Sequence, residues 1–308
     1  MKEIKDFEIV SHSSLSFLEI FFVEMHSRGA HGHSDIEMGI VLKGEVTLFI
    51  DNEVYELKQG DIYYTNRYQI HALSTRTDFS MILVMQVSRK FYKNMDPTLE
   101  FLFMQENVIR NQAARMRLAD KFFKLADTYF GESELYALHS ARLLIEITEM
   151  MADNVPHTVK SEQESQSARA NSRRINRMTE YIEEHYAEKL TLDDIAALDH
   201  ISPYHASHFF KEMAGMSFQD YLNQVRFEHA IQLIHSSDLK LIDICMETGF
   251  SSTRYLNQMF EKNYGCSAKD FIRDRKKYHR KPTALPTGDN QKRYSYNASR
   301  TILASIHH

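Results

Sequence analysis

Hydrophobic and polar positions follow two different periods along the chain. From about residue 15 to 88, apolar residues alternate with polar ones in short runs, as at Val46, Leu48 and Ile50. Turn-forming residues separate these runs, at Lys43-Gly44, Asp51-Asn52 and Gln59-Gly60-Asp61. Alternation broken by frequent turns is typical of short strands, so we predict a small β-barrel or sandwich over this stretch.

From about residue 97 to 152 the period becomes helical. One apolar face is formed by Phe122, Leu125, Ala126 and Tyr129, and a second by Leu138, Ala141, Ile145 and Thr148. Two helices joined near Gly131-Glu132-Ser133 would form an antiparallel pair. Their apolar surface is broad, so we expect them both to cover the barrel and to pair with a second copy of the chain.

The stretch 153–172 is rich in Ser, Gln and Glu and has no apolar period, which is typical of a linker. A helical block follows to about residue 280, and the last residues contain few candidates for a core, which favours a flexible tail. The expected fold class is therefore α+β with two domains. The boundaries are 1–155 for the barrel and helix pair, 156–172 for the linker, 173–280 for an all-α domain and 281–308 for the tail.

Within the helical block the sequence nearly repeats itself. Leu192, Asp194 and Ile195 recur 49 residues later as Leu241, Asp243 and Ile244, and the two copies cover 190–222 and 239–272. Repetition over so many positions indicates a duplicated structural unit. Each copy consists of a short helix, a tight turn and a second helix, so we predict two helix-turn-helix units joined by a long helix from Phe218 to His235.

Capping residues support this interpretation of the first copy. Thr191 precedes its first helix with Asp194 three positions later, as in a capping box. Ser202 precedes the second helix, and Pro203 occupies the first helical position, where a missing N–H does no harm. A helix that docks in the major groove needs short or planar polar groups in its first two turns. The outward positions that we predict to contact DNA are Tyr204, His205, Ser207, His208 and Lys211 in the first copy and Arg254, Tyr255, Asn257 and Gln258 in the second.

Composition and charge narrow the possible classes of protein. The formal net charge is −5, which excludes attraction to DNA by bulk charge, so a basic footprint must be local. One basic cluster is present, at Arg273, Arg275, Lys276, Lys277, Arg280 and Lys281. The sequence has no apolar run long enough to span a membrane. Its first residues, MKEIKDFEIVSHSS, lack the apolar stretch of a secretory signal, so export is not expected. With only two cysteines, a cytoplasmic location is expected.

The segment from about 173 to 275 resembles the C-terminal domain of the AraC/XylS family of bacterial regulators. The resemblance rests on LTLDDIAALDHISPYHASHFFKEMAGMSFQDYLNQVRFEHA and IDICMETGFSSTRYLNQMFEKNYGCSAKDFIR. It implies two helix-turn-helix units that read adjacent major-groove turns of double-stranded DNA, with Tyr204, Ser207 and His208 in the first and Arg254, Tyr255 and Gln258 in the second. It also implies an activator, with RNA polymerase as a further partner. The chain departs from the family at His200, where glycine is usual in the first turn, and at His208, where arginine is frequent.

The N-terminal region contains a group of residues suited to a metal ion. His31, His33, Glu37 and His71 lie on neighbouring predicted strands, and imidazole and carboxylate groups suit a divalent transition metal. In an extended strand His31 and His33 point to the same face. The alternative is that these polar groups bind no metal and instead line an effector pocket or form local hydrogen bonds. Other groups that could recognise hydroxyls or a carboxylate are His26, Arg28, Tyr63, Tyr64, Arg67 and Tyr68.

This region resembles the cupin fold. The spacing His31-x-His33-x3-Glu37-x6-Gly44 matches the first cupin motif, and Gly60 to His71 has the spacing of the second. Asn66 and Tyr68 replace the usual proline and glycine. Cupins fused to AraC-type domains usually bind small effectors, often sugars, in the barrel. The effector contacts predicted here are His31, His33, Glu37, Tyr64 and His71.

We expect a homodimeric, effector-controlled transcription regulator with no catalytic residues and no cofactor other than the metal considered above. The rival hypothesis is a metal-dependent cupin enzyme, an isomerase or dioxygenase, with an accessory DNA-binding domain. A third is a DNA-binding scaffold whose barrel binds no ligand. The sequence contains no nucleophile triad and no phosphate-binding glycine loop, which favours the regulator over an enzyme.

Overall fold

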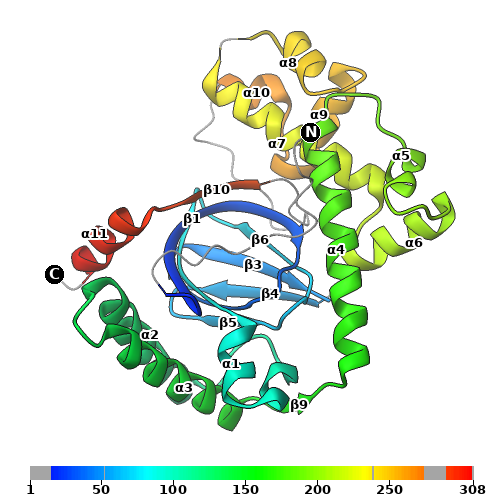
Figure 1. Ribbon diagram of the computed structural model, residues 1–308. Coiled ribbons are helices and arrows are strands. Elements are labelled where there is room, and N and C mark those ends of the chain that lie inside the picture. The colour runs from blue at the N-terminus through cyan, green and yellow to red at the C-terminus, as the bar shows by residue number, and fades with distance from the viewer. Residues whose placement is uncertain (1–14, 52, 238, 274–288, 307–308) are drawn as a thin grey trace.

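The computed structural model describes residues 15–51, 53–237, 239–273 and 289–306. A β-barrel lies at its centre, with two helices along one side and a long helix along the other, next to a separate helical body (Figure 1). Of the basic cluster named above, only Arg273 lies within the described residues. Across the described ranges, no helix has both the length and the apolar character to cross a membrane.

The strands are β1 (Leu18–His31), β2 (Ile36–Lys43), β3 (Glu45–Ile50), β4 (Glu53–Lys58), β5 (Ile62–Thr65), β6 (His71–Thr75), β7 (Ser80–Val87), β8 (Leu102–Met104), β9 (His157–Val159) and β10 (Asp289–Arg293). The helices are α1 (Arg89–Met95), a 3-10 helix η1 (Pro97–Phe101), α2 (Gln112–Gly131), α3 (Tyr136–Asn154), α4 (Glu162–His185), α5 (Leu192–Ala197), α6 (Pro203–Ala214), α7 (Phe218–Ser236), α8 (Leu241–Glu247), α9 (Thr253–Tyr264), α10 (Ala268–Arg273) and α11 (Tyr296–Ile306).

The predicted barrel is confirmed. Its strands pair in the order β4-β3-β6-β1-β7-β2-β5, and β10 pairs with the remaining edge of β1. Two of the predicted turns contain glycine in the left-handed region, Gly44 at φ +82° and Gly60 at φ +88°. Glycine is required there because a side chain would strain the backbone at these angles. Asp51 takes the same region at φ +48° in the third turn.

The two faces of the barrel wall have separate cores. Residues such as Val46, Leu48 and Tyr63 form one cluster, and Met38, Ile62 and Tyr64 join α2 and α3 in another. The predicted face of α2 is confirmed, because Phe122, Leu125, Ala126 and Tyr129 are fully buried. The predicted face of α3 is wrong: Leu138 is 64% and Ile145 41% exposed, and the helix instead buries Leu143, Leu144, Ile147 and Met151.

The predicted linker is wrong from residue 162 onward. Helix α4 begins there with a capping box in which Ser161 accepts from the N–H of Glu164 and the Glu164 carboxylate accepts from the N–H of Ser161. Before it, β9 pairs with β8. The early turns of α4 are mostly exposed to solvent, so their sequence shows no apolar period. The capping box and residues that favour helix formation are sufficient to make these turns helical.

The prediction of a flexible tail is also wrong for 289–306. Strand β10 runs antiparallel to β1, from Val23 opposite Arg293 to Arg28 opposite Asp289 (Figure 1). Beyond it, the N–H of Tyr294 donates to Phe22 O at 2.9 Å, and the N–H of Phe22 donates to Ser299 Oγ at 3.3 Å. We call residues 289–306 the C-terminal strap. It covers the free edge of β1, which would otherwise present unpaired backbone groups.

Two helix-turn-helix units are present as predicted, α5–α6 and α8–α9, joined by α7. The predicted capping box of Thr191 and Asp194 and the predicted cap of Ser202 are both formed. His200 adopts φ +53° in the first turn, the conformation that Gly249 adopts at φ +71° in the second. A side chain at Gly249 would lie 2.7 Å from Ala187 O, so only the second turn also requires glycine for space.

The strap should contribute measurably to stability. Leu303 is 3% exposed within the core that contains α2, so Leu303→Ala should lower the free energy of unfolding by about 2 kcal/mol. Ile306 on the same helix is 44% exposed, and Ile306→Ala is the matched control, with an expected change below about 0.5 kcal/mol. Urea denaturation of both variants measures the difference, and equal changes would contradict the docking of the strap.

Candidate functional site

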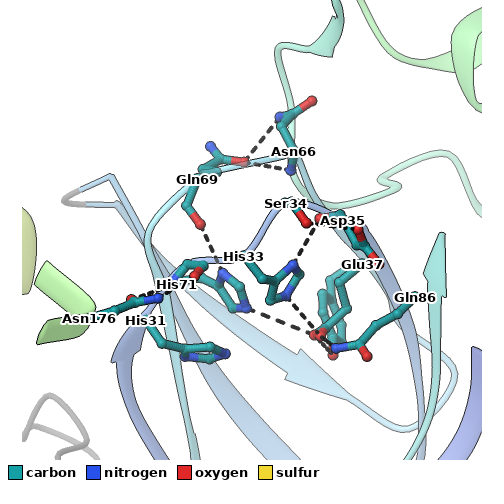
Figure 2. A network of polar contacts seen from close by, with 12 residues as sticks. His31, His33, Ser34, Asp35, Glu37, Asn66, Gln69, His71, Gln86 and Asn176 are labelled. Atoms are coloured by element: carbon teal, nitrogen blue, oxygen red, sulfur yellow. Dashed lines mark hydrogen bonds and ion pairs between the residues drawn. The ribbon is translucent and has the colours of Figure 1, made fainter. Parts of the chain in front are cut away.

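The four predicted metal ligands lie together at one end of the barrel (Figure 2). His31 ends β1 and lies opposite His71, the first residue of β6, with ring centroids 4.2 Å apart. The His33 ring lies 5.3 Å from that of His71 and 6.0 Å from that of His31. One ligand atom from each of these histidines lies within 4.8 Å of the others.

Backbone carbonyl groups orient all three imidazoles. The Nδ1 atoms of His31, His33 and His71 lie 2.8, 2.8 and 3.0 Å from the carbonyl oxygens of Gly29, Asp35 and Gln69, respectively. Because a carbonyl oxygen only accepts, each Nδ1 donates a proton, and the Nε2 of a neutral ring then carries a lone pair. Carbonyl groups orient histidine ligands in many metal sites in this way.

Glu37 supplies a negative charge beside these nitrogens. Its Oε2 lies 3.4 Å from His33 Nε2, and its Oε1 lies 4.0 Å from His71 Nε2. Burial alone raises the pKa of Glu37, but the hydrogen bond with His33 and the positive charges of His71 and His33 outweigh it and lower the pKa to about 2. The negative charge of this carboxylate can be balanced either by a proton on one of the imidazoles or by a divalent cation.

The pKa of His31 is lowered like that of Glu37, but for a histidine this shift favours the neutral form. Burial, followed by the charges of His71, Arg28 and His33, holds the pKa of His31 well below its usual value of 6.5. His31 is therefore neutral at pH 7, the form that binds a metal. The three oriented imidazoles form a group of donors that suits a divalent transition metal, and the Glu37 carboxylate lies beside two of them.

Two hydrogen bonds hold the Glu37 carboxylate in place. The hydroxyl of Tyr63 donates to Oε1 at 2.9 Å, and the side chain of Gln86 donates to Oε2 at 3.0 Å. Sequence analysis did not select Gln86, although the pairing of Glu37 with Gln86 across β2 and β7 places both on one face.

The predicted effector contact Tyr64 does not join this group. It belongs to the core formed with α2 and α3, whereas its neighbour Tyr63 belongs to the opposite core and contacts Glu37. Successive residues of a strand point to opposite faces, so choosing the wrong one of two adjacent tyrosines places the side chain on the wrong side of the wall.

The predicted DNA-contacting residues are mostly solvent-exposed. On α6 these are Tyr204, His205, Ser207, His208 and Lys211, and on α9 they are Arg254, Tyr255 and Gln258. Asn257 differs from them because its side chain donates to Thr253 O and accepts from the N–H of Ala268, both at 2.9 Å. These bonds fix Asn257 to the start of α10, so we leave it out of the DNA-contacting set proposed below.

Comparison with known families assigns both regions. Residues 195–274 match the helix-turn-helix domain family, and residues 21–87 match the cupin domain family. The chain thus contains, in this order, a region similar to cupin domains and a region similar to helix-turn-helix domains. This agrees with both resemblances noted in the sequence and with the observed α+β fold.

Named relatives are regulators. An uncharacterized HTH-type transcriptional regulator of Staphylococcus aureus is 26% identical over 238 residues, which are 77% of this chain and 31% of the relative. The uncharacterized HTH-type transcriptional regulator YijO of Escherichia coli (strain K12) is 36% identical over 108 residues, 35% of this chain and 37% of the relative. The chain therefore spans about a third of the length of these relatives. The structure of ToxT from Vibrio cholerae is 12% identical, covers 83% of this chain and 97% of ToxT, and has a TM-score of 0.40.

The contact between Tyr63 and Glu37 within the cupin domain depends on Gly39. A Cβ at Gly39 would lie 2.2 Å from Cε1 of Tyr63 and 2.6 Å from its hydroxyl oxygen. Gly39→Ala should therefore displace the ring and lower the free energy of unfolding by about 1–3 kcal/mol, as overpacked cores do. Gly131, at the end of α2, has no neighbouring atom within 4 Å of such a Cβ, so Gly131→Ala is the control. Thermal unfolding compares the two, and no loss of stability in Gly39→Ala would contradict this close contact.

Proposed function

We propose that this protein is a transcription regulator that binds double-stranded DNA through both helix-turn-helix units. The observation that carries the proposal is the pair of units on one scaffold, each with a polar, exposed face on its second helix. Relatives that are named as transcriptional regulators support this proposal and favour it over a cupin enzyme. A cytoplasmic location follows from this role.

Base recognition is assigned to the first turns of α6 and α9. Tyr204, Ser207 and His208 would face bases in the first unit, and Arg254, Tyr255 and Gln258 in the second. Arginine can bond guanine and glutamine can bond adenine through two atoms each, which makes α9 the stronger reader. His205 and Lys211 are placed to contact the DNA backbone, which supplies affinity without sequence preference.

The cupin domain is proposed as the sensor. His31, His33, Glu37 and His71 would hold a divalent transition metal, and a small effector would bind beside them. Support comes from the three oriented imidazoles, which lie close enough to share one ion, and from the Glu37 carboxylate beside His33 and His71. A metal would act here as a Lewis acid that binds an electron-rich group of the effector.

A homodimer is also proposed. Leu138 and Ile145 form an exposed apolar stripe on α3, on the side of that helix away from its buried residues. Such a stripe is the kind of surface that a second copy of the chain can cover. The regulator would then present four helix-turn-helix units to one operator and, as an activator, would contact RNA polymerase.

DNA recognition by α9 is tested with the full chain. Selection from random double-stranded DNA identifies a binding site, and fluorescence anisotropy then measures affinity. Arg254→Ala should weaken binding by about tenfold or more, because a lost guanine contact costs about 1–3 kcal/mol. Arg110 has a 73% exposed side chain outside the DNA-binding domain, so Arg110→Ala is the control and should bind normally. Unchanged affinity in Arg254→Ala would remove this residue from the interface.

The metal site is tested by titrating the full chain with Co²⁺ and Zn²⁺. Wild type should bind one ion per chain, and His71→Ala should bind it at least tenfold more weakly, since even the loss of a group that orients a ligand costs about 10–100-fold. His26, whose side chain is 37% exposed, offers the control His26→Ala. Absence of metal from wild type, or equal binding by His71→Ala, would contradict the assigned ligands.

A further inference from the structure

The buried side chain of Asn176 on α4 forms hydrogen bonds with the histidine-bearing segment of the barrel. The N–H of Gly32 donates to Asn176 Oδ1 at 2.9 Å, and Asn176 Nδ2 donates to Gly32 O at 2.6 Å. Asn176 is 3% exposed, and Figure 2 shows it approaching from the side opposite Glu37. Both the oxygen and the nitrogen of the Asn176 carboxamide therefore form hydrogen bonds with the backbone of one residue, Gly32.

Gly32 stands between two of the proposed metal ligands, His31 and His33. A side chain at Gly32 would lie 2.6 Å from Ser172 Oγ and 3.0 Å from Ile70 Cδ1. Glycine is thus required for α4 to reach the backbone of this segment. A change in the position of either neighbouring histidine must move the groups that Asn176 holds, because they belong to adjoining peptide units.

The other face of α4 belongs to the first helix-turn-helix unit. Ile175, Met178 and Ile182 are fully buried in one cluster with residues of α5 and α6. Arg177 also forms an ion pair with Asp199, which lies in the turn of that unit. The same cluster includes Ala30 and Ile70 of the barrel, so the first unit and the barrel share a core. A displacement of α4 should therefore also move α6, the helix that carries Tyr204 and His208.

We propose that Asn176 is the residue through which occupancy of the histidine cluster controls the position of the DNA-binding domain. This inference rests on the proposed function of the cupin domain as a sensor. An ion held by His31 and His33 restricts the intervening peptide to one orientation, and Asn176 makes both hydrogen bonds only in such an orientation. Ion binding and docking of α4 then stabilise each other, and by linkage each changes the affinity of the other site by the same factor.

The test uses the full chain, Co²⁺ as the probe and the selected DNA fragment. In wild type, saturating Co²⁺ should change the DNA affinity by about fivefold or more, the range typical of coupled sites. Asn176→Ala should reduce this ratio to below about twofold, yet retain the Co²⁺ absorption spectrum, because all four ligands remain. Asn171→Ala, a change of the same residue type on α4, is the matched control and should keep the wild-type ratio.

A second variant separates coupling from folding. Asn176→Asp has nearly the same shape and keeps an acceptor for the N–H of Gly32, but it loses the donor to Gly32 O. It should fold and show an intermediate ratio. Hydrogen exchange of wild type adds an independent measurement: Co²⁺ should slow exchange of the amides in 172–182 and leave those of α9 unchanged.

The outcomes distinguish this inference from the proposed function. Wild type that binds no Co²⁺ overturns the metal site and, with it, this role of Asn176, while DNA binding can still be measured. Wild type that binds both Co²⁺ and DNA without coupling overturns the inference alone. The inference is likewise overturned if Asn176→Ala, with a normal melting temperature, keeps the full wild-type ratio.

Discussion

The structure depends on how the polar backbone of β1 is satisfied along both of its edges. One edge pairs with β7 and then with β6, and the other pairs with β10 of the C-terminal strap. Just after the strand ends, the backbone N–H and C=O of Gly32 form hydrogen bonds with the side chain of Asn176 on α4. Buried peptide groups need partners, and here segments far apart in the sequence supply them. Strands β6 and β7, helix α4 and the C-terminal strap are therefore all held by β1 and the residue that follows it.

Patterns of local origin were predictable from the sequence. The strands followed from alternation and glycine turns, and the two helix-turn-helix units followed from a repeat with caps at Thr191 and Ser202. The histidine cluster was predictable too, because the spacing of His31 and His33 places them on one face and only His71 had to come from another strand. In each case the information lies in the spacing of residues along the sequence, within one element or between two copies of a unit.

The features that the sequence did not predict depend on partners in another domain. The strap buries Ser299 and Leu303 but exposes most of its other residues, so its own pattern resembles a tail. The early turns of α4 carry no apolar stripe, and Asn176 gains its role only from the backbone of Gly32. The sequence also did not show which of the two adjacent tyrosines, Tyr63 or Tyr64, lies beside Glu37. That depends on the register of β5 against β2, in which Tyr63 lies opposite Gly39.

The C-terminal strap also constrains the order in which the protein can fold. Among the described residues, 289–306 are synthesised last, yet they complete the edge of β1, which is the earliest of the described strands in the sequence. Until then that edge is open to pairing with other chains, the state in which multidomain proteins are prone to aggregate. Contacts across more than 270 residues, such as that between Phe22 and Ser299, form slowly because a long loop must close first. Completion of the barrel edge therefore follows synthesis of both helix-turn-helix units, which lie between β1 and the strap in the sequence.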